Sequence, residues 1–294
     1  MASTAGKGAA RRLRWKVLSL AASGALTATG LSWVTASAPA AAAPQTVVTI
    51  QFDDGTADQI DALPILQAHG MAATFYVNSG PVLAGDPTHM TLAQLTDLFN
   101  AGNEIAGHTV DHVNIQPLSA ADARAEVCDD RNNLLAMGFP VTSFAYPFGS
   151  YDSASEDVVH YCGYNSGRTV SGISLKKPPA GESLPPLDPY ATRTPPDTKK
   201  STKLSTLEQY VLNAEAGVQS GGSSLWLQFT FHHLCAAHCG AYNITPDKFT
   251  AFLDFLQAQE ANGVVVETTA QAVGGPVNPP CDPVTGTGCV TSPR

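Results

Sequence analysis

Two adjacent carboxylates, Asp53 and Asp54, follow the apolar run 47–52 and precede Gly55. Neighbouring side chains of a strand point to opposite faces, but a turn at the end of the strand can bring both acids into one site. Two acids in one site can divide the work, because one can bind a cation while the other moves a proton. Asp and Gly are also common in surface turns, so this stretch alone predicts either a site or a turn.

Two histidines, His108 and His112, are separated by four positions in the sequence His-Thr-Val-Asp-His. On a helical turn or in a tight loop, this spacing points both rings at one centre. Together with a carboxylate they would form a His-His-Asp set that leaves positions open for water and substrate, as zinc and other first-row divalent ions use. Two surface histidines flanking an acid are the alternative, but the upstream Asp pair favours a metal site.

Polar side chains of catalytic types recur where predicted strands end. Asp53 and Asp54 end one strand, 108–112 follows another, 146–149 ends a third, and His232 ends a late one. In a parallel barrel all these strand ends lie on one face, where active sites are built. The pattern therefore predicts that residues scattered along the chain meet in one site.

The elements that must position these residues alternate strand then helix about six or seven times, which favours parallel strands joined by helical crossovers. A barrel or distorted barrel suits this count; an open doubly wound sheet is the alternative, although its Gly-rich loop is missing. Residues 119–138 are predicted to form one long helix, and 170–201, which show no periodicity, a long loop. The predicted strands are 47–52, 71–77, 141–146, 164–168, 225–231 and 264–266.

The first 43 residues resemble a secretory signal peptide, with a basic start, a mostly apolar stretch at 17–34 and small residues that permit cleavage near 38 or 43. A retained membrane anchor is the alternative, but Gly24 and Gly30 interrupt the stretch. We therefore expect an exported protein with no stable membrane insertion after cleavage. The expected parts of the mature chain are a catalytic domain at 44–274 and a Pro-rich tail at 275–294.

The predicted signal contains five of the sixteen Lys and Arg residues, which leaves eleven against 25 Asp and Glu. Such an acidic chain is a poor match for nucleic acid or an anionic membrane surface. It is compatible with a neutral or cationic polymer as partner, although solubility alone would explain the charge as well. The roughly 250 remaining residues suit a single domain with a large core.

All six cysteines follow the predicted signal, so disulfides are the expected state. Cys235 and Cys239 are close in the sequence, as are Cys281 and Cys289, which leaves Cys128 to pair with Cys162. Fifteen pairings are formally possible. Zinc binding by these cysteines is the alternative, but their spacing matches no standard zinc finger.

Four segments together resemble the NodB-type polysaccharide deacetylases, carbohydrate esterase family 4. They are Gln51-Phe52-Asp53-Asp54-Gly55, 108–112, 145–149 and 225–232, in the order in which the family carries its motifs. The resemblance spans nearly the whole mature domain. It implies an α/β fold, a distorted (β/α) barrel with about seven parallel strands. It also implies a divalent-metal hydrolase that removes N-acetyl or O-acetyl groups from sugars.

Carried over by position, the resemblance implies that Asp54, His108 and His112 bind the metal ion, with Zn expected first and Co or Ni as alternatives. Asp53 matches the general base and His232 the general acid. The third motif resembles the segment that supplies a backbone N–H to the oxyanion, which we place at Tyr146.

This chain departs from the family pattern in three ways. Ala145 stands where the family has an arginine that orients the base, and Arg168 is either its replacement or a solvated strand-end arginine. The usual Asp and Trp of the fourth motif are not evident near 164–168. Finally, His233 follows His232, and strand alternation cannot choose between them; the family pattern favours His232.

The sequence therefore predicts a secreted or cell-wall-associated monomer that deacetylates a carbohydrate such as chitin, peptidoglycan or acetylxylan. A non-catalytic carbohydrate-binding protein on the same fold is the alternative, which the missing arginine at Ala145 sustains. A wall-associated structural protein with an uncleaved N-terminus is a further alternative.

Overall fold

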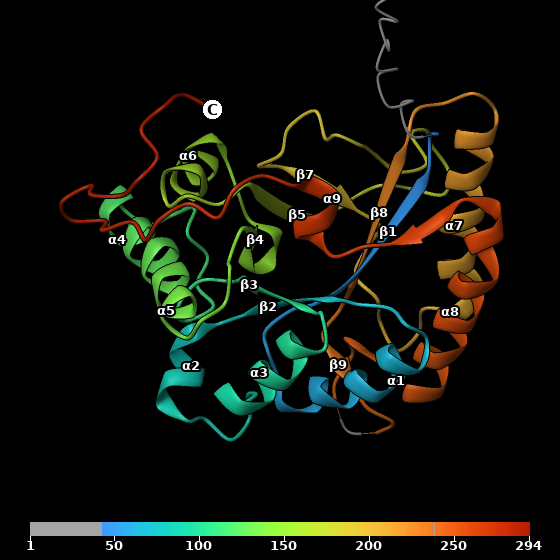
Figure 1. Cartoon of the computed structure of the whole chain (residues 1–294), viewed down its shortest axis with the longest axis horizontal. Helices are drawn as coiled ribbons and strands as arrows, with labels where there is room; N and C mark the ends of the chain where they lie inside the picture. The colour runs from blue at the N-terminus through green and yellow to red at the C-terminus, as the bar shows by residue number, and fades with distance from the viewer. Residues whose placement is uncertain (1–42, 238) are drawn as a thin grey trace, which may run out of the picture. The chain divides into compact units, whose positions relative to one another are not determined.

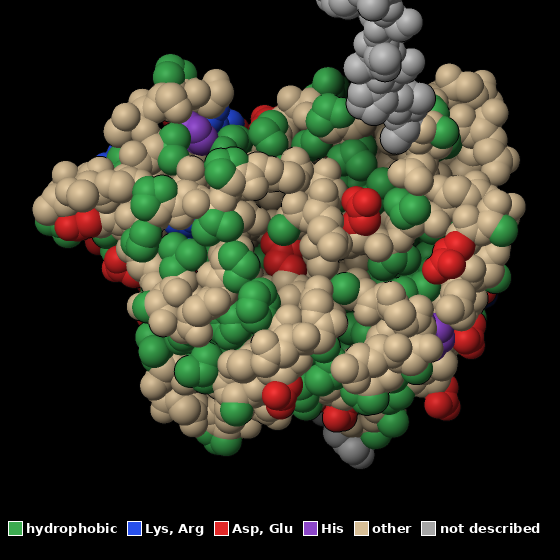
Figure 2. Space-filling view, in the orientation of Figure 1, with side chains coloured by type: hydrophobic (Ala, Val, Ile, Leu, Met, Phe, Trp, Pro, Cys, Tyr) green, Lys and Arg blue, Asp and Glu red, His purple; other side chains and the backbone are tan. Residues whose placement is uncertain are grey.

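The computed structural model describes residues 43–237 and 239–294 (Figure 1). The predicted signal lies almost wholly outside the described residues, so its cleavage and the proposed domain boundaries stay predictions. None of the helices in the described part of the chain combines the length and apolar character that a membrane span needs. Figure 2 shows acidic side chains scattered over one face of the molecule, with far fewer basic ones.

One sheet of nine strands forms the centre of the fold, in the order β6-β8-β1-β2-β3-β4-β5-β7, with β11 also paired to β1. Every pairing in this sheet is parallel except that of β6 with β8. The strands are β1 (Thr46–Phe52), β2 (Thr74–Val77), β3 (Glu104–Gly107), β4 (Ser143–Ala145), β5 (Ser166–Gly172), β6 (Glu182–Ser183), β7 (Thr192–Thr194), β8 (Leu225–Phe231) and β11 (Val264–Val266). A small second sheet pairs β9 (His233–Leu234) with β10 (Asn243–Ile244).

The sheet curls into a nearly closed barrel, which confirms the predicted fold class. Its distortion is clearest at β1: β8 pairs with the full strand on one side, while β11 and β2 share the other side. The two ends of the sheet meet through isolated hydrogen bonds, from the Arg193 N–H to Glu182 Oε2 at 3.1 Å and from Gln228 Nε2 to the Arg193 carbonyl at 3.2 Å. Closure therefore relies on side chains where a regular ladder is missing.

Helices cover the outside of this barrel, and Figure 1 shows α7 and α8 along one flank. They are α1 (Ala62–Ala68), α2 (Ser79–Ala84), α3 (Leu92–Asn100), α4 (Ala120–Arg124), α5 (Asp130–Ala136), α6 (Ser153–Tyr161), α7 (Leu204–Gln219), α8 (Pro246–Gln259) and α9 (Thr269–Val273). Several begin at side-chain caps: Thr91 accepts from the Gln94 N–H, Ser119 from Asp122 and Thr245 from Lys248. Such caps satisfy N–H groups that the first helical turn leaves unpaired.

Strand alternation separates a polar barrel interior from an apolar outer layer. Gln51 Nε2 donates to Gln228 Oε1 inside the barrel at 3.0 Å, whereas the outward rings of Phe52 and Phe231 pack edge-on against Phe249 of α8. Side chains alternate between the two faces of a strand, so the residues directly after each strand continue the same alternation between the interior and the outside. Asp53 continues the inward phase of Gln51, and His232 continues that of Gln228.

Two predicted elements differ from the structure. The helix expected at 119–138 is interrupted by a π-helical segment at Ala125–Asp129, between α4 and α5. The loop expected at 170–201 contains the end of β5 and both β6 and β7. Strands of two or three residues carry no readable periodicity, and they form here because the neighbouring strands offer unpaired edges.

Disulfides join the three predicted pairs, Cys128–Cys162, Cys235–Cys239 and Cys281–Cys289. The first ties the π-helical segment to the end of α6. The tail packs on the domain, because the buried Arg131 guanidinium donates to the carbonyls of Asn278 at 2.7 Å and Pro279 at 3.0 Å.

Candidate active site

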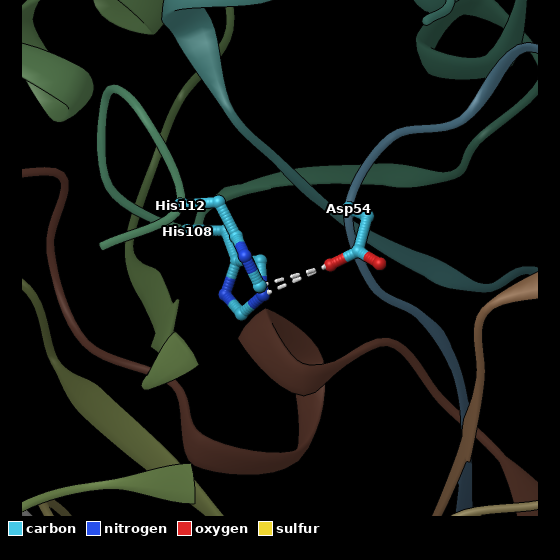
Figure 3. A group of neighbouring side chains, drawn as sticks. All are labelled: Asp54, His108 and His112. Carbon is cyan, nitrogen blue, oxygen red and sulfur yellow. Dashed lines mark ion pairs between the residues drawn. The ribbon is translucent and has the colours of Figure 1, made fainter. Parts of the chain in front are cut away.

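Asp54, His108 and His112 converge from the ends of β1 and β3 (Figure 3). Asp54 Oδ1 lies 3.4 Å from His108 Nε2 and 3.2 Å from His112 Nε2. The facing ligand atoms of the three residues all lie within 4.8 Å of one another. One carboxylate oxygen and two imidazole nitrogens at this separation form a donor set that suits a divalent first-row ion.

The protonation pattern of His108 tests whether this set fits a metal ion. Its Nδ1 lies 2.7 Å from the Ala145 carbonyl, to which it can only donate, so in the neutral ring Nε2 is an acceptor. Asp54 Oδ1 is also an acceptor, and among the described residues it has no hydrogen-bond donor. Two buried acceptors that face each other require a cation or a proton between them. The residues present therefore fit a metal ion.

Electrostatics in the same group agree with this geometry. Burial alone raises the pKa of Asp54, but His108 and His112 more than offset it and hold that pKa well below its usual value. Burial lowers the pKa of His108, yet Asp54 and Asp53 raise it above its ordinary value overall. A metal ion that binds here therefore competes with a proton on His108.

Left-handed backbone conformations gather at this site. Asp54, Thr109, His112 and Phe148 have φ values of 75°, 67°, 53° and 60°. Non-glycine residues seldom adopt such angles, and each costs on the order of 1–3 kcal/mol. Strain of this kind persists where surrounding contacts hold it, and here it accompanies the turns that present the ligands.

Asp130 holds the backbone of His108 in place. Its Oδ2 accepts the His108 N–H and its Oδ1 accepts the Ser79 N–H, both at 2.9 Å. Burial raises the pKa of Asp130 to about 7. No pattern in the sequence marks this residue, because an acid in a predicted helix resembles a solvated surface residue unless the orientation of the helix is known.

Arg168 lies against Asp53 in the barrel interior. Its Nη2 is 2.6 Å from both carboxylate oxygens, and the two side chains are almost fully buried. Arg168 pairs in register with Ala145 on the neighbouring strand. The guanidinium thus reaches the carboxylate from β5, the strand next to β4, which carries Ala145. Burial lowers the pKa of Arg168, but the charge of Asp53 raises it overall.

The adjacent histidines diverge. His232 lines a pocket of about 400 Å³ that also contains the metal-ligand set, whereas His233 Nδ1 lies 3.0 Å from Asp58 Oδ1. The pocket is lined by Asp53, Asp54, His108, His112, Tyr146, Phe148, Val170, Asp197, His232 and Tyr242. The inward phase of β8 explains why His232, and not its neighbour, enters this pocket.

Four pocket residues were not among the predicted site residues: Phe148, Val170, Asp197 and Tyr242. The ring of Phe148 packs edge-on against His112, with centroids 4.6 Å apart, and Tyr242 lies 5.2 Å from the ring of His232. The pKa of Asp197 is raised by burial and by the charge of Asp53. Asp197 and Tyr242 lie in connections without helical or strand periodicity, so no local signal marks them.

The structure contradicts the placement of the oxyanion donor at Tyr146. Its backbone N–H donates to the Arg168 carbonyl at 3.0 Å, which continues the ladder between β4 and β5. Its phenol donates to the Tyr190 carbonyl at 2.9 Å. Both donors are therefore engaged. Pro147 has no N–H, so the first amide beyond the ladder belongs to Phe148.

Comparison with known proteins gives a family match over residues 40–167, to the model described as polysaccharide deacetylase. The chain is 31% identical over 125 residues to the putative polysaccharide deacetylase YxkH of Bacillus subtilis, over 42% of this chain and 44% of that protein. It is 34% identical over 107 residues to a probable peptidoglycan-N-acetylglucosamine deacetylase of Arthroderma benhamiae, over 35% of this chain and 24% of that protein. The matched segment thus spans less than half of either relative.

Two solved structures share the fold. The Bc1960 peptidoglycan N-acetylglucosamine deacetylase aligns with a TM-score of 0.51 and 15% identity, over 78% of this chain and 88% of that one. The T48 deacetylase aligns with a TM-score of 0.50 and 15% identity, over 79% and 95%. At this identity the likeness bears on the fold alone, and it agrees with the distorted barrel.

Proposed function

Residues 40–167 belong to the polysaccharide deacetylase family, and from this premise we propose that the protein is a secreted, metal-dependent hydrolase that removes acetyl groups from a carbohydrate. One observation carries the proposal: the pocket brings the Asp54, His108 and His112 set together with the Asp53–Arg168 pair and His232. These are the groups that metal-assisted hydrolysis of an amide or ester requires.

We assign the metal ion to Asp54, His108 and His112, with Zn first and Co or Ni as alternatives. When bound, such an ion supplies Lewis-acid polarisation of the acetyl carbonyl. The Ala145 carbonyl fixes the orientation of the His108 ring through Nδ1, and Asp130 fixes its backbone. A ligand held from two sides keeps its Nε2 directed at the site, which favours binding.

Asp53 acts as the general base in this proposal. A base must be ionised to accept a proton from the attacking water, and a buried carboxylate alone resists ionisation. The adjacent Arg168 guanidinium forms an ion pair with Asp53 and sets the direction of the carboxylate. This contact supports the catalytic function over the non-catalytic alternative, which rested on the missing arginine at Ala145.

His232 acts as the general acid that protonates the leaving amine or alcohol. An unprotonated amine anion is a very poor leaving group, so this proton decides whether the C–N bond breaks. His232 and Asp197 both line the pocket. We assign the oxyanion donor to the Phe148 N–H in place of Tyr146, because Phe148 lines the same pocket beside His112.

The substrate class is an acetylated oligosaccharide or polysaccharide, with chitin, peptidoglycan and acetylxylan as the candidates. Two exposed aromatic side chains, Phe148 at 66% and Tyr242 at 41%, border the pocket and offer apolar surface to a sugar ring. A partner of this kind fits an exported protein, located outside the cell or at the cell wall, that works as a monomer.

Acetate release tests the proposal. The mature protein is loaded with Zn, Co or Ni and incubated with chitin oligomers, peptidoglycan fragments and acetylxylan, and free acetate is quantified. We expect release from at least one substrate, loss on chelation and recovery on adding metal. Asp111→Asn, at an exposed carboxylate between the two histidines, is the matched control for Asp54→Asn. Binding of these glycans without acetate release would favour the carbohydrate-binding alternative.

A further inference from the structure

Gln59 is a fully buried amide between the ends of two catalytic strands. It lies in the 3₁₀ turn Ala57–Asp61, directly after the Asp53–Gly55 turn, and none of its surface is exposed. Its Nε2 donates to the carbonyl of Asp53 and, at 2.7 Å, to the carbonyl of His232. One side chain therefore contacts the backbone of the proposed base and of the proposed acid.

The location of these carbonyls explains why an amide is needed there. β1 and β8 pair along their full length, and the last rung runs from the Asp53 N–H to the Phe231 carbonyl at 2.9 Å. The carbonyls of Asp53 and His232 thus lie past the end of the ladder, where Gln59 bridges them as an additional rung.

The chemistry of the bridge identifies which end of the amide faces the carbonyls. Only the NH2 group has two hydrogens to donate, whereas the amide oxygen would repel both carbonyl oxygens. Gln59 Oε1 is buried and has no donor among the described residues, so the nitrogen contacts alone account for the burial of this polar group. The side chain is uncharged and therefore holds the two backbones without adding charge to the base.

Neighbours in the same turn hold the other side of the His232 segment. Asp58 Oδ2 accepts the Leu234 N–H at 2.8 Å, and Asp58 Oδ1 lies 3.0 Å from His233 Nδ1. The turn Ala57–Asp61 therefore contacts each of residues 232–234. Gln59 is the member of this turn that contacts both catalytic segments at once.

We propose that Gln59 is a positioning residue that sets the separation of the general base Asp53 from the general acid His232. The inference rests on the proposed function for those two roles. Proton transfers at the two sides of one reacting carbon need both groups within hydrogen-bond reach of it, and a displacement of about 1 Å can cost on the order of 10²-fold in rate. A buried bridge between their backbones limits such displacement.

Gln59→Glu and Gln59→Leu test the proposal. Glu keeps the shape and loses the two donors, and Leu removes the polar group. Gln67→Glu, at an exposed position of α1, controls for the change of charge. We expect kcat for acetate release to fall by about 10- to 100-fold in both Gln59 variants, with KM, metal content and the circular dichroism spectrum unchanged. Gln67→Glu should match the wild type.

A second readout does not depend on turnover. The ring resonances of His232, identified by their absence in His232→Asn, should shift in Gln59→Glu and not in Gln67→Glu. Unchanged kcat with unshifted resonances in both Gln59 variants would overturn the inference. So would a kcat loss matched by loss of metal or of folded structure, because that pattern marks a general structural role. If the wild type releases no acetate from any substrate, the proposed function fails, and the resonances alone then decide the positioning.

Discussion

Arg168 and Asp53 form a buried ion pair in which one guanidinium nitrogen lies 2.6 Å from both carboxylate oxygens. Arg168 on β5 pairs with Ala145 on β4. The guanidinium is therefore supplied by the strand next to β4, where the family that this chain resembles has its arginine. Neighbouring strands of a barrel bring their inward side chains to nearly the same point. A charge at one strand end can therefore be supplied by the next strand without moving the base.

Arg168→Met should cost about 3–5 kcal/mol of unfolding free energy, because it leaves Asp53 buried and unpaired. Acetate release by Arg168→Met should fall as well. The double variant Asp53→Asn with Arg168→Met should recover much of the stability but no activity, since no base remains. Denaturant unfolding measures the first effect. Lys177→Met, which removes an exposed cation, is the control, and equal stability losses in Arg168→Met and Lys177→Met would contradict the assignment.

Asp54→Asn and His108→Ala should each abolish stoichiometric metal binding, because each removes one of three protein ligands. Metal content after dialysis, measured by elemental analysis, tests this directly. Asp53→Asn should retain the metal ion and lose turnover, since it alters the base and not the ligand set. If Asp53→Asn lost its metal while Asp54→Asn kept it, the two roles would be reversed.

Metal affinity should rise with pH across and above about 6.5, the ordinary pKa of histidine. Burial lowers the pKa of His108, but Asp54 and Asp53 raise it by more than burial lowers it. His108 therefore stays protonated in the metal-free protein to a higher pH than an ordinary histidine. The ion displaces this proton, so affinity falls as pH decreases through the raised pKa. Calorimetry in buffers of different ionisation enthalpy should detect proton release, and a pH-independent affinity would refute it.

The metal-free protein should show the opposite trend in stability. A histidine whose pKa is raised on folding stabilises the fold fully below its unfolded pKa, and this contribution disappears as pH rises through the folded pKa. His108→Ala should reduce that slope. Thermal unfolding of the chelated wild type and variant between pH 5 and 8 compares the two.

His232→Asn should lower kcat by about 10²–10⁴-fold, the range expected when a general acid is removed. His233→Asn should leave kcat within a few-fold of the wild type, because its ring contacts Asp58 away from the reacting groups. A larger kcat loss in His233→Asn than in His232→Asn would reassign the acid.

Local patterns in the sequence determined much of the fold and the site. The alternation of strands and helices predicted the barrel, because periodicity follows from local backbone geometry and from which face is buried. The Asp53-Asp54 pair and the spacing of His108 and His112 predicted a metal site, because strand ends of a parallel barrel meet on one face, and the family resemblance selected Asp54 as the carboxylate ligand. Two Cys pairs were predicted from proximity in the sequence and the third, Cys128–Cys162, as the pair that remained; the structure joins the same pairs.

Relations between distant segments were decided only by the tertiary structure. The register of β4 and β5 places Arg168 beside Ala145 and engages the Tyr146 N–H, which excludes it as the oxyanion donor. The polar interior, and not alternation alone, decides that His232 enters the pocket. Gln59 bridges two strand ends, and one of its partners, the carbonyl of His232, lies 173 residues further along the chain. None of these leaves a mark in its own neighbourhood of the sequence, because register and long-range hydrogen bonds depend on how strands pair across the whole chain.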